Sequence, residues 1–293
     1  MDELLAQQFE ANRPHLRAVA YRMLGSLSDA DDAVQDAWLR FSRADRSDVE
    51  NVRAWLTTVV ARVSLNMLQS RKTRREEPWD GHLPDPLVSV QDEADPEHEA
   101  ILGDSIGLAL MVVLEQLSPP ERLAFVLHDI FGVSFDEIAP IVDRTPTAAR
   151  QLASRARRRV QRGADIPDRD LTGQREVVEA FLAAAREGNF ERLLEVLDPG
   201  VVLRNDYGTA VAAGPREVRG ATAVANGAIT FSRLRVGGTA RIVLVNGAVG
   251  LIRVQDGRPV SLMAFTVAHG RLVEIDILHD PERLDRLNAV PTN

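Results

Sequence analysis

The apolar residues in the first quarter of the chain recur at helical spacing. Within 30–41 they fall three or four positions apart, so a helix would carry them on one face. Ser28, with Asp31 three positions later, is the kind of pair that caps the start of such a helix. A second apolar stripe with the same period covers 52–63. These patterns predict that residues 1–75 form a helical domain.

A second helical block is predicted over residues 100–163. Ser118 precedes two prolines, which suit the first turn of a helix, and Gly132 suits a helix end. Residues 134–142 and 146–161 form two further helical segments that are joined by a short polar break. This spacing is typical of a helix–turn–helix.

Residues 174–293 have a different character. One amphipathic helix is predicted at about 174–187, and alternating segments typical of strands follow it. Dipeptides that favour tight hairpins separate these segments: Asn246-Gly247, Asp256-Gly257 and His269-Gly270. Helices followed by a meandering antiparallel sheet predict an α+β domain. Two linkers divide the chain, one acidic and proline-containing at 76–99 and a short one at 164–173.

Charge is strongly segregated along the chain. The whole chain has 35 Lys and Arg against 43 Asp and Glu, a formal charge of −8. Residues 51–75 nevertheless hold six cations and no acid, and residues 144–164 hold seven arginines and no acid. The segment 76–99 between them has nine acids and no lysine or arginine. Two basic surfaces separated by an acidic connector indicate two contacts with one polyanion.

The composition excludes several classes of binding site and predicts where the protein is located. The chain has no cysteine, so disulfides and cysteine-based zinc sites are excluded. The histidines lack ligand spacing, and we expect no metal and no cofactor. The N-terminus has no apolar signal region, and the longest apolar run, 106–114, is too short to cross a bilayer. We therefore expect a cytoplasmic protein without membrane contact.

The arginine-rich segment has two different faces. Small apolar residues at Ala149, Ala153 and Ala156 share one face and would allow close packing on a neighbouring helix. Guanidinium groups project from the other face and suit phosphates and guanine edges. A solvated surface helix is the simpler alternative. Because another helix precedes it at helix–turn–helix spacing, the segment favours DNA binding.

Several motifs in order resemble one family. The segment 27–41 reads "LSDADDAVQDAWLRF", and 51–76 reads "NVRAWLTTVVARVSLNMLQSRKTRRE". Together they resemble region 2 of the extracytoplasmic-function sigma factors. The segment 117–160 reads "LSPPERLAFVLHDIFGVSFDEIAPIVDRTPTAARQLASRARRRV" and resembles their region 4. The resemblance implies binding to core RNA polymerase, through the β′ clamp helices and the β flap, and recognition of the −10 and −35 elements of promoter DNA.

The resemblance assigns candidate residues to three surfaces. The acidic face of the predicted helix coincides with the polymerase-binding segment: Asp29, Asp32, Gln35 and Asp36. Cationic and amide side chains of the next helix are candidates for the −10 element: Arg62, Asn66, Arg71, Lys72 and Arg74. The exposed side of the arginine-rich helix supplies candidates for the −35 element: Thr147, Arg150, Gln151, Ser154, Arg155 and Arg158.

The last part of the chain resembles the SnoaL-like (NTF2-like) fold, a cone of curved sheet against helices. Sigma factors that carry it form the SigJ-like group. "HLPDP" (82–86), "DYGTA" (206–210) and "DPERL" (280–284) resemble signatures of this group, the second in reduced form. The resemblance implies that this domain contacts the linker and regulates the sigma domains from within. The contact candidates are Leu83, Pro84, Asp85, Pro86, Asp206, Asp280, Pro281 and Leu284.

The predicted fold class is therefore multidomain: a region 2 helical bundle, a region 4 helix–turn–helix and an α+β SnoaL/NTF2-like cone. Two other functions stay open. A stand-alone helix–turn–helix regulator would leave the acidic face without a role. A SnoaL-like enzyme or ligand sensor could use Asp206, Tyr207, Asp276 and His279 as acid–base groups. Asp276, however, alternates with apolar neighbours, which favours a solvent-facing position, and we expect no catalysis.

Overall fold

The computed structural model describes residues 2–44, 51–73, 82–89, 107–163, 167–208, 217–234 and 238–287. These residues form two compact units. The first unit contains the described residues up to 73 and those from 110 to 163. The second contains 82–89, 107–109 and the residues from 167 onward. Residues of the predicted acidic linker thus belong to the same unit as the C-terminal sheet.

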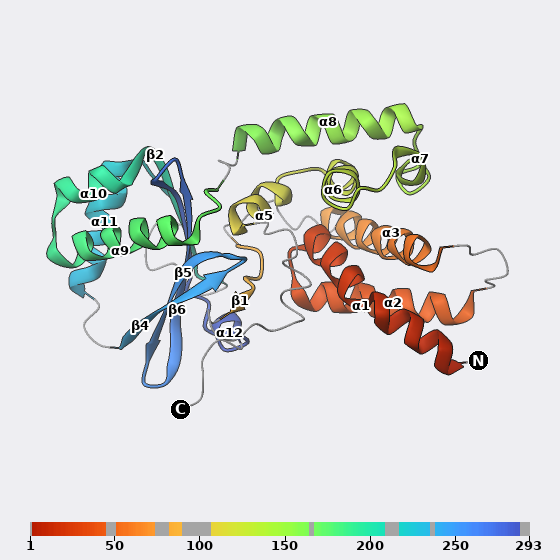
Figure 1. Ribbon diagram of the computed structural model, residues 1–293, viewed down its shortest axis with the longest axis horizontal. Helices are drawn as coiled ribbons and strands as arrows, with labels where there is room; N and C mark the ends of the chain where they lie inside the picture. The colour runs from red at the N-terminus through yellow and green to blue at the C-terminus, as the bar shows by residue number, and fades with distance from the viewer. Residues whose placement is uncertain are drawn as a thin grey trace. The chain divides into compact units, whose positions relative to one another are not determined.

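Three helices open the first unit: α1 (Asp2–Leu24), α2 (Leu27–Arg43) and α3 (Val52–Thr73), labelled in Figure 1. They pack on one another around buried apolar side chains that include Phe9, Phe41 and Leu56. The Trp55 ring lies 5.7 Å from the Phe41 ring, and Trp38 lies 5.0 Å from Phe9, so aromatic contacts join all three helices.

The start of α2 differs from the sequence-based prediction. Ser26, rather than Ser28, is the N-cap, and its hydroxyl accepts a hydrogen bond from the Asp29 amide at 3.3 Å. The reason lies in Gly25, whose φ of +72° ends α1 and turns the chain at once. Ser26 is then the first side chain able to satisfy the free amides of the next helix.

Helix α5 (Leu108–Glu115) starts with two residues of the second unit and continues in the first. The rest of the first unit contains α6 (Pro119–Phe125), a π-helical turn η1 (Val126–Ile130), α7 (Phe135–Ile138) and α8 (Pro146–Gly163). Ser118 and Gly132 occupy the predicted start and end, and Gly132 has a φ of +70°. Glu121 completes a capping box with Ser118. Helix α8 packs against α6 and α7 through its alanine face.

The second unit is built on one sheet with the order β1-β4-β5-β6-β7-β2-β3. Its strands are β1 (Val88–Ser89), β2 (Leu197–Asp206), β3 (Glu217–Arg219), β4 (Thr239–Val245), β5 (Ala248–Gln255), β6 (Arg258–Ala268) and β7 (Arg271–Leu278). The three predicted hairpins are confirmed between β4 and β7. Asn246, Asp256 and His269 each have a positive φ, as these tight turns require.

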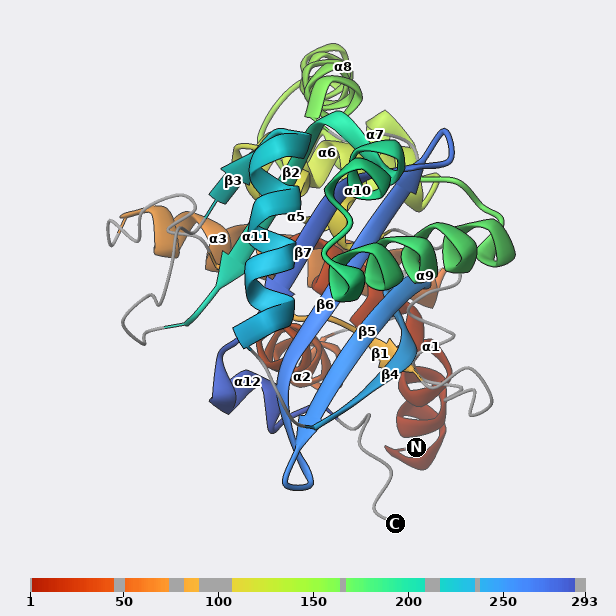
Figure 2. The ribbon, with the colours of Figure 1, turned by 90° about the vertical axis from the view of Figure 1, so that its left-hand side faces the viewer.

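Helices cover one face of this sheet. Figure 2 shows α9 (Leu171–Glu187), α10 (Phe190–Val196) and α11 (Ala221–Leu234) lying across it, and α12 (Pro281–Leu284) follows β7. Strand residues alternate between two cores because successive side chains point to opposite faces. Ile275 and Ile277 pack with the helices, whereas Leu278 packs on the other face with Leu108 and Val88.

Candidate functional site

Some of the acidic side chains of α2 are held in ion pairs, and others are exposed. Asp32 and Gln35 are exposed. Asp36 is half-buried and accepts a hydrogen bond from Arg40 at 2.9 Å. Asp29 is also half-buried, and its carboxylate pairs with Arg71 of α3. The accessible acidic surface is therefore the middle of α2, while Asp29 helps to hold α2 against α3.

The described candidates for the −10 element lie along α3. Arg62 and Asn66 are exposed, and Arg71 is held by Asp29. Lys72 belongs to α3, but its side chain and the whole of Arg74 lie outside the described residues. The accessible candidates among the described side chains are Arg62 and Asn66.

Arginines also join the two groups of helices inside the first unit. Arg62 donates to the Pro140 carbonyl at 2.9 Å, and Arg122 of α6 donates to the Arg22 carbonyl of α1 at 3.1 Å. Arg122 is buried, and this burial lowers its pKa to about 10, with the Glu115 carboxylate acting in the opposite direction. Arg62, a candidate for the −10 contact, is thus hydrogen-bonded to the helix–turn–helix segment in this structure.

Helix α8 has the two predicted faces. Ala149, Ala153 and Ala156 are fully buried, which lets the helix approach α6 closely. Most of the candidate −35 side chains are exposed on the opposite side: Thr147, Arg150, Gln151, Arg155 and Arg158. Ser154 is half-buried. The Arg150 guanidinium lies over the Phe135 ring of α7 at 5.2 Å, a contact that orients its fork.

Glu121 and Asp129, two acids that the sequence analysis did not name, hold three further arginines of α8 in position. Glu121 is 5% exposed and accepts from Arg155 at 3.0 Å and from Arg159 at 2.9 Å. Asp129 accepts from Arg157 at 2.6 Å. Burial raises the pKa of Glu121, but hydrogen bonds from Ser118 and Arg155 and the charge of Arg159 outweigh it, so the net pKa lies below its usual range. The anionic Glu121 orients one edge of the arginine face.

Residues 82–89, which we call the linker strip, are attached to the sheet of the second unit. The Leu83 amide donates to the Asp206 carboxylate at 2.7 Å. The Leu87 amide donates to the Asn246 side chain at 3.0 Å, and the Asn246 amide donates back to the Leu87 carbonyl at 2.8 Å. Strand β1 then pairs antiparallel with β4 at the edge of the sheet. The strip is therefore bound by main-chain hydrogen bonds at both ends.

Arg283 of α12 lies at the centre of this attachment. It is 8% exposed and donates to the Leu83 carbonyl at 2.7 Å, to Asp85 at 2.9 Å and to Asp206 at 2.5 Å. Asp206 is completely buried. The sequence analysis named the neighbours of Arg283 and missed Arg283 itself, although it lies within the "DPERL" signature. The available signal was that Asp85 and Asp206, two acidic candidates for the same contact, require a cation near them.

The other named contact residues support Arg283. Asp280 caps α12 by accepting from the Glu282 amide at 3.0 Å, Pro281 is the first helical residue, and Leu284 is buried. Gly208, the glycine of the reduced "DYGTA" signature, has a φ of +60°. A Cβ at this position would lie 2.3 Å from the Asp280 carboxylate, so the turn requires glycine.

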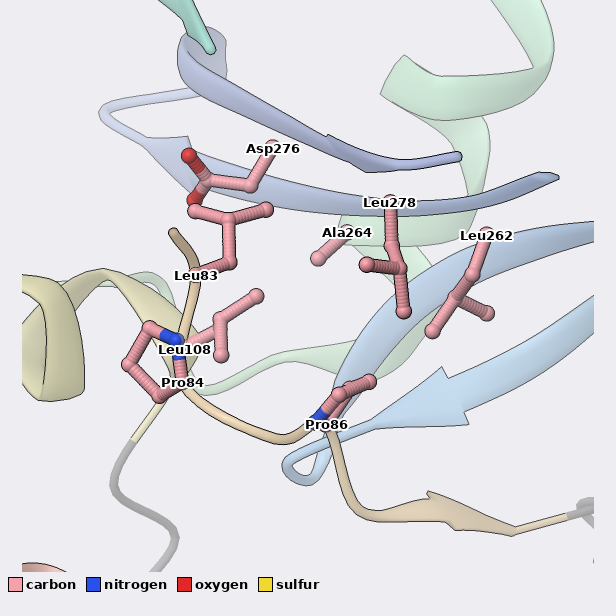
Figure 3. A pocket seen from close by; sticks show the side chains of 8 residues that line it. All are labelled: Leu83, Pro84, Pro86, Leu108, Leu262, Ala264, Asp276 and Leu278. Carbon is pink, nitrogen blue, oxygen red and sulfur yellow. The ribbon is translucent and has the colours of Figure 1, made fainter. Parts of the chain in front are cut away.

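Apolar contacts complete the strip. Figure 3 shows Leu83, Pro84 and Pro86 against side chains of the sheet. The opposing residues are Leu262, Ala264, Asp276 and Leu278, together with Leu108. The prolines limit the conformations of the free strip, so less entropy is lost when it docks.

Asp276 lies under this strip, and its predicted solvent-facing position is wrong. It is 2% exposed and pairs with Arg204 at 3.1 Å, while Arg204 also pairs with Glu274 at 3.2 Å. Burial raises the pKa of Asp276 to about 6, although the Arg204 charge acts in the opposite direction. The alternation along β7 predicts one buried face and one solvent-exposed face, but the linker strip covers the face that carries Asp276.

The four acid–base candidates do not converge. Asp206 and Asp276 point toward the linker strip. Tyr207 and His279 line a pocket on the helix-covered face, where their rings stack with a centroid distance of 4.9 Å. The sheet thus separates the carboxylates from the histidine. Within the part of the chain that the structure describes, no cluster of His, Asp or Glu could hold a metal ion, and no helix could cross a membrane.

Known proteins resemble this chain along most of its length. Residues 8–74 match Sigma-70 region 2, and residues 107–160 match Sigma-70 region 4. The ECF RNA polymerase sigma factor SigJ of Mycobacterium tuberculosis is 37% identical over 94% of this chain and 92% of its own length. This chain belongs to the extracytoplasmic-function RNA polymerase sigma factors. The probable sigma factor SigI of the same species is 34% identical over 96% and 95% of the two chains.

The likeness of this sigma factor to SigJ includes the C-terminal unit. The crystal structure of Mycobacterium tuberculosis SigJ matches 95% of this chain and 97% of its own, with 35% identity and a TM-score of 0.77. The region 2 match covers α1–α3, and the region 4 match covers α5–α8. The predicted fold class is confirmed: two helical sigma domains and a C-terminal NTF2-like domain of helices and sheet. This membership does not favour the stand-alone regulator.

Proposed function

We propose that this sigma factor binds core RNA polymerase, directs it to promoter DNA and is regulated by its own C-terminal unit through the linker strip. The observation that carries the proposal is the exposed arginine and glutamine face of α8 in a chain with both sigma regions. A helix that buries alanines and presents guanidinium groups has the form required in a major groove.

The polymerase contact is assigned to α2. Asp32 and Gln35 are exposed beside Asp36, and Leu39 is exposed one turn further along the same face, so the surface is acidic with one apolar side chain at its end. Such a surface suits a basic protein partner, for which we propose the clamp helices of the β′ subunit. Region 4 would contact the β flap. Asp29 contributes indirectly, by fixing α2 on α3 through Arg71.

The DNA contacts are assigned to α8 and α3. Arg150, Gln151 and Arg158 would reach the −35 element, with Arg155 held in position by Glu121. Arg62 and Asn66 would contact the opened −10 element. The bond between Arg62 and the Pro140 carbonyl must break before Arg62 can bind DNA. The arrangement of the first unit is therefore assigned to the closed state of the free protein.

Regulation is assigned to the linker strip. Its main-chain groups and Asp85 are bound by Arg283, Asp206 and Asn246, so the strip cannot serve as an extended connector while it is docked. Because the strip and its site are on one chain, docking competes at a high effective concentration with polymerase and DNA. The contacts support a switch between docked and released strip.

A titration of core RNA polymerase from a related bacterium with the labelled full-length chain tests the proposal. We expect saturable binding tighter than about 1 μM, and promoter-dependent transcripts from the resulting complex. Tight DNA binding by the free chain together with no polymerase binding would instead establish a stand-alone regulator.

A further inference from the structure

The C-terminal unit contains a large pocket on the face of the sheet opposite the linker strip. Its volume is about 1290 Å³, and it lies between the sheet and helices α9 and α11. Pockets for small molecules usually measure roughly 300–1,000 Å³, so this one has room for a sizeable organic molecule. Aromatic and aliphatic side chains supply much of its wall: Phe181, Phe231, Leu251, Met263 and Ile277.

One end of the pocket carries polar and aromatic groups. Tyr207 and His279 stack with an interplanar angle of 9°, and His279 Nε2 lies 3.3 Å from Asn205 Oδ1. These residues stand at the ends of β2 and β7. An apolar wall with a few fixed polar groups is the usual composition of a site that orients an organic ligand.

The charge inside the pocket is positive. Among the described residues that line it, the charged ones are Glu179, Arg186 and Arg253. Glu179 and Arg186 are exposed on α9, whereas Arg253 comes from β5 and is half-buried. A guanidinium among apolar walls favours a carboxylate, which it can bind with two parallel hydrogen bonds.

We propose that this pocket binds an apolar organic carboxylate, with the carboxylate on Arg253 and the hydrocarbon or aromatic body between α9, α11 and the sheet. The carboxylates of Asp206 and Asp276 do not reach this pocket, because both lie on the far side of the sheet. The inference concerns the pocket alone and does not depend on polymerase binding.

Competition against a fluorescent apolar anion tests the inference on the full-length chain. The probe is 1-anilinonaphthalene-8-sulfonate, and the competitors are decanoate, 1-decanol and decylammonium below their micelle concentrations. We expect decanoate to displace the probe at a concentration about tenfold lower than 1-decanol, because its carboxylate can form a charged hydrogen-bonded pair with Arg253 and the hydroxyl of 1-decanol cannot. Decylammonium should be the weakest competitor.

Variants locate the site. Arg253→Met should remove the preference for decanoate, and Arg253→Lys should keep part of it. Arg241→Met is the matched control, because Arg241 is exposed on the neighbouring β4 and does not line the pocket. Gly227→Leu should weaken all binding, since Gly227 lines the pocket and an added Cβ meets no atom within 4 Å.

Two results would overturn the inference. One is equal displacement by decanoate and 1-decanol in the unmodified protein, a measurement that does not depend on whether any variant folds. The other is a decanoate preference that survives Arg253→Met in a protein with an unchanged melting temperature.

Discussion

Arg283 donates two hydrogen bonds to the carboxylate of Asp85, a residue 198 positions earlier in the chain. The same guanidinium also binds the Leu83 carbonyl and the buried Asp206. One side chain thus closes a loop that contains the whole of region 4. This contact makes the linker strip part of the C-terminal unit. The C-terminal unit therefore binds the segment that connects the two sigma regions.

Replacing Arg283 should release the linker strip. In Arg283→Met we expect hydrogen exchange at the Leu83 and Leu87 amides to become at least about tenfold faster, equivalent to roughly 1.4 kcal/mol of opening free energy. Both amides donate to side chains of the sheet in the docked state. Arg286→Met, at an exposed position three residues later, is the control and should leave both rates unchanged.

Asp85→Asn provides a milder form of the same experiment. Arg283→Met leaves Asp206 buried without its cation, a change that costs about 3–5 kcal/mol in comparable sites. Asp85 is more exposed, and its replacement keeps the pair between Arg283 and Asp206. Exchange at Leu83 should therefore rise less than in Arg283→Met. Unchanged exchange in both variants would mean that Arg283 does not hold the strip.

Gly208→Ala should destabilise the C-terminal unit more than an ordinary turn substitution. Alanine at positive φ costs about 1–2 kcal/mol, and here the new Cβ also meets the Asp280 carboxylate. Gly257→Ala is the matched control, since it has a φ of +76° and no neighbour within 4 Å of the added Cβ. The difference between the two free energies of unfolding in urea should be on the order of 1–2 kcal/mol. Equal losses would contradict the required fit of Gly208 against Asp280.

Asp276 should make stability depend on pH between its ordinary pKa of 3.8 and its folded pKa of about 6. Because the folded pKa is raised, the folded state binds more protons in this window, and the contribution of Asp276 to stability falls as pH rises. Asp276→Asn removes this titration. The free energy of unfolding of the unmodified protein minus that of the variant should therefore decrease by on the order of 1–3 kcal/mol across the window. A rising difference, measured by urea unfolding, would contradict the assignment.

Local signals allowed much of the fold to be predicted. The turns at Asn246, Asp256 and His269 form because adjacent residues decide a tight hairpin. The stripes of α2 and the alanine face of α8 likewise follow from spacing alone. The cap at Ser26 was misplaced by two residues, because Gly25 sets the preceding turn through a backbone angle that the side-chain pattern does not show.

Partners far apart in the chain could not be predicted. Glu121 and Asp129 hold arginines of α8 from 28 to 38 positions away. Asp276 was expected in solvent because nothing in β7 shows that the linker strip will cover its face. Arg283 contacts residues 77 to 200 positions away, and such contacts depend on how the sheet and strip assemble.

The measurement that tests the central claim most directly is a titration of core RNA polymerase with the full-length chain and with Asp32→Arg plus Asp36→Arg. Glu10→Arg plus Asp31→Arg is the control, because it makes the same change in charge at exposed positions of region 2 outside this face. We predict that the control binds like the unmodified protein and that the Asp32 and Asp36 variant loses at least about 100-fold in affinity, roughly 2.7 kcal/mol, with an unchanged melting temperature. Equal affinity of all three proteins would contradict the assignment of this face to the polymerase.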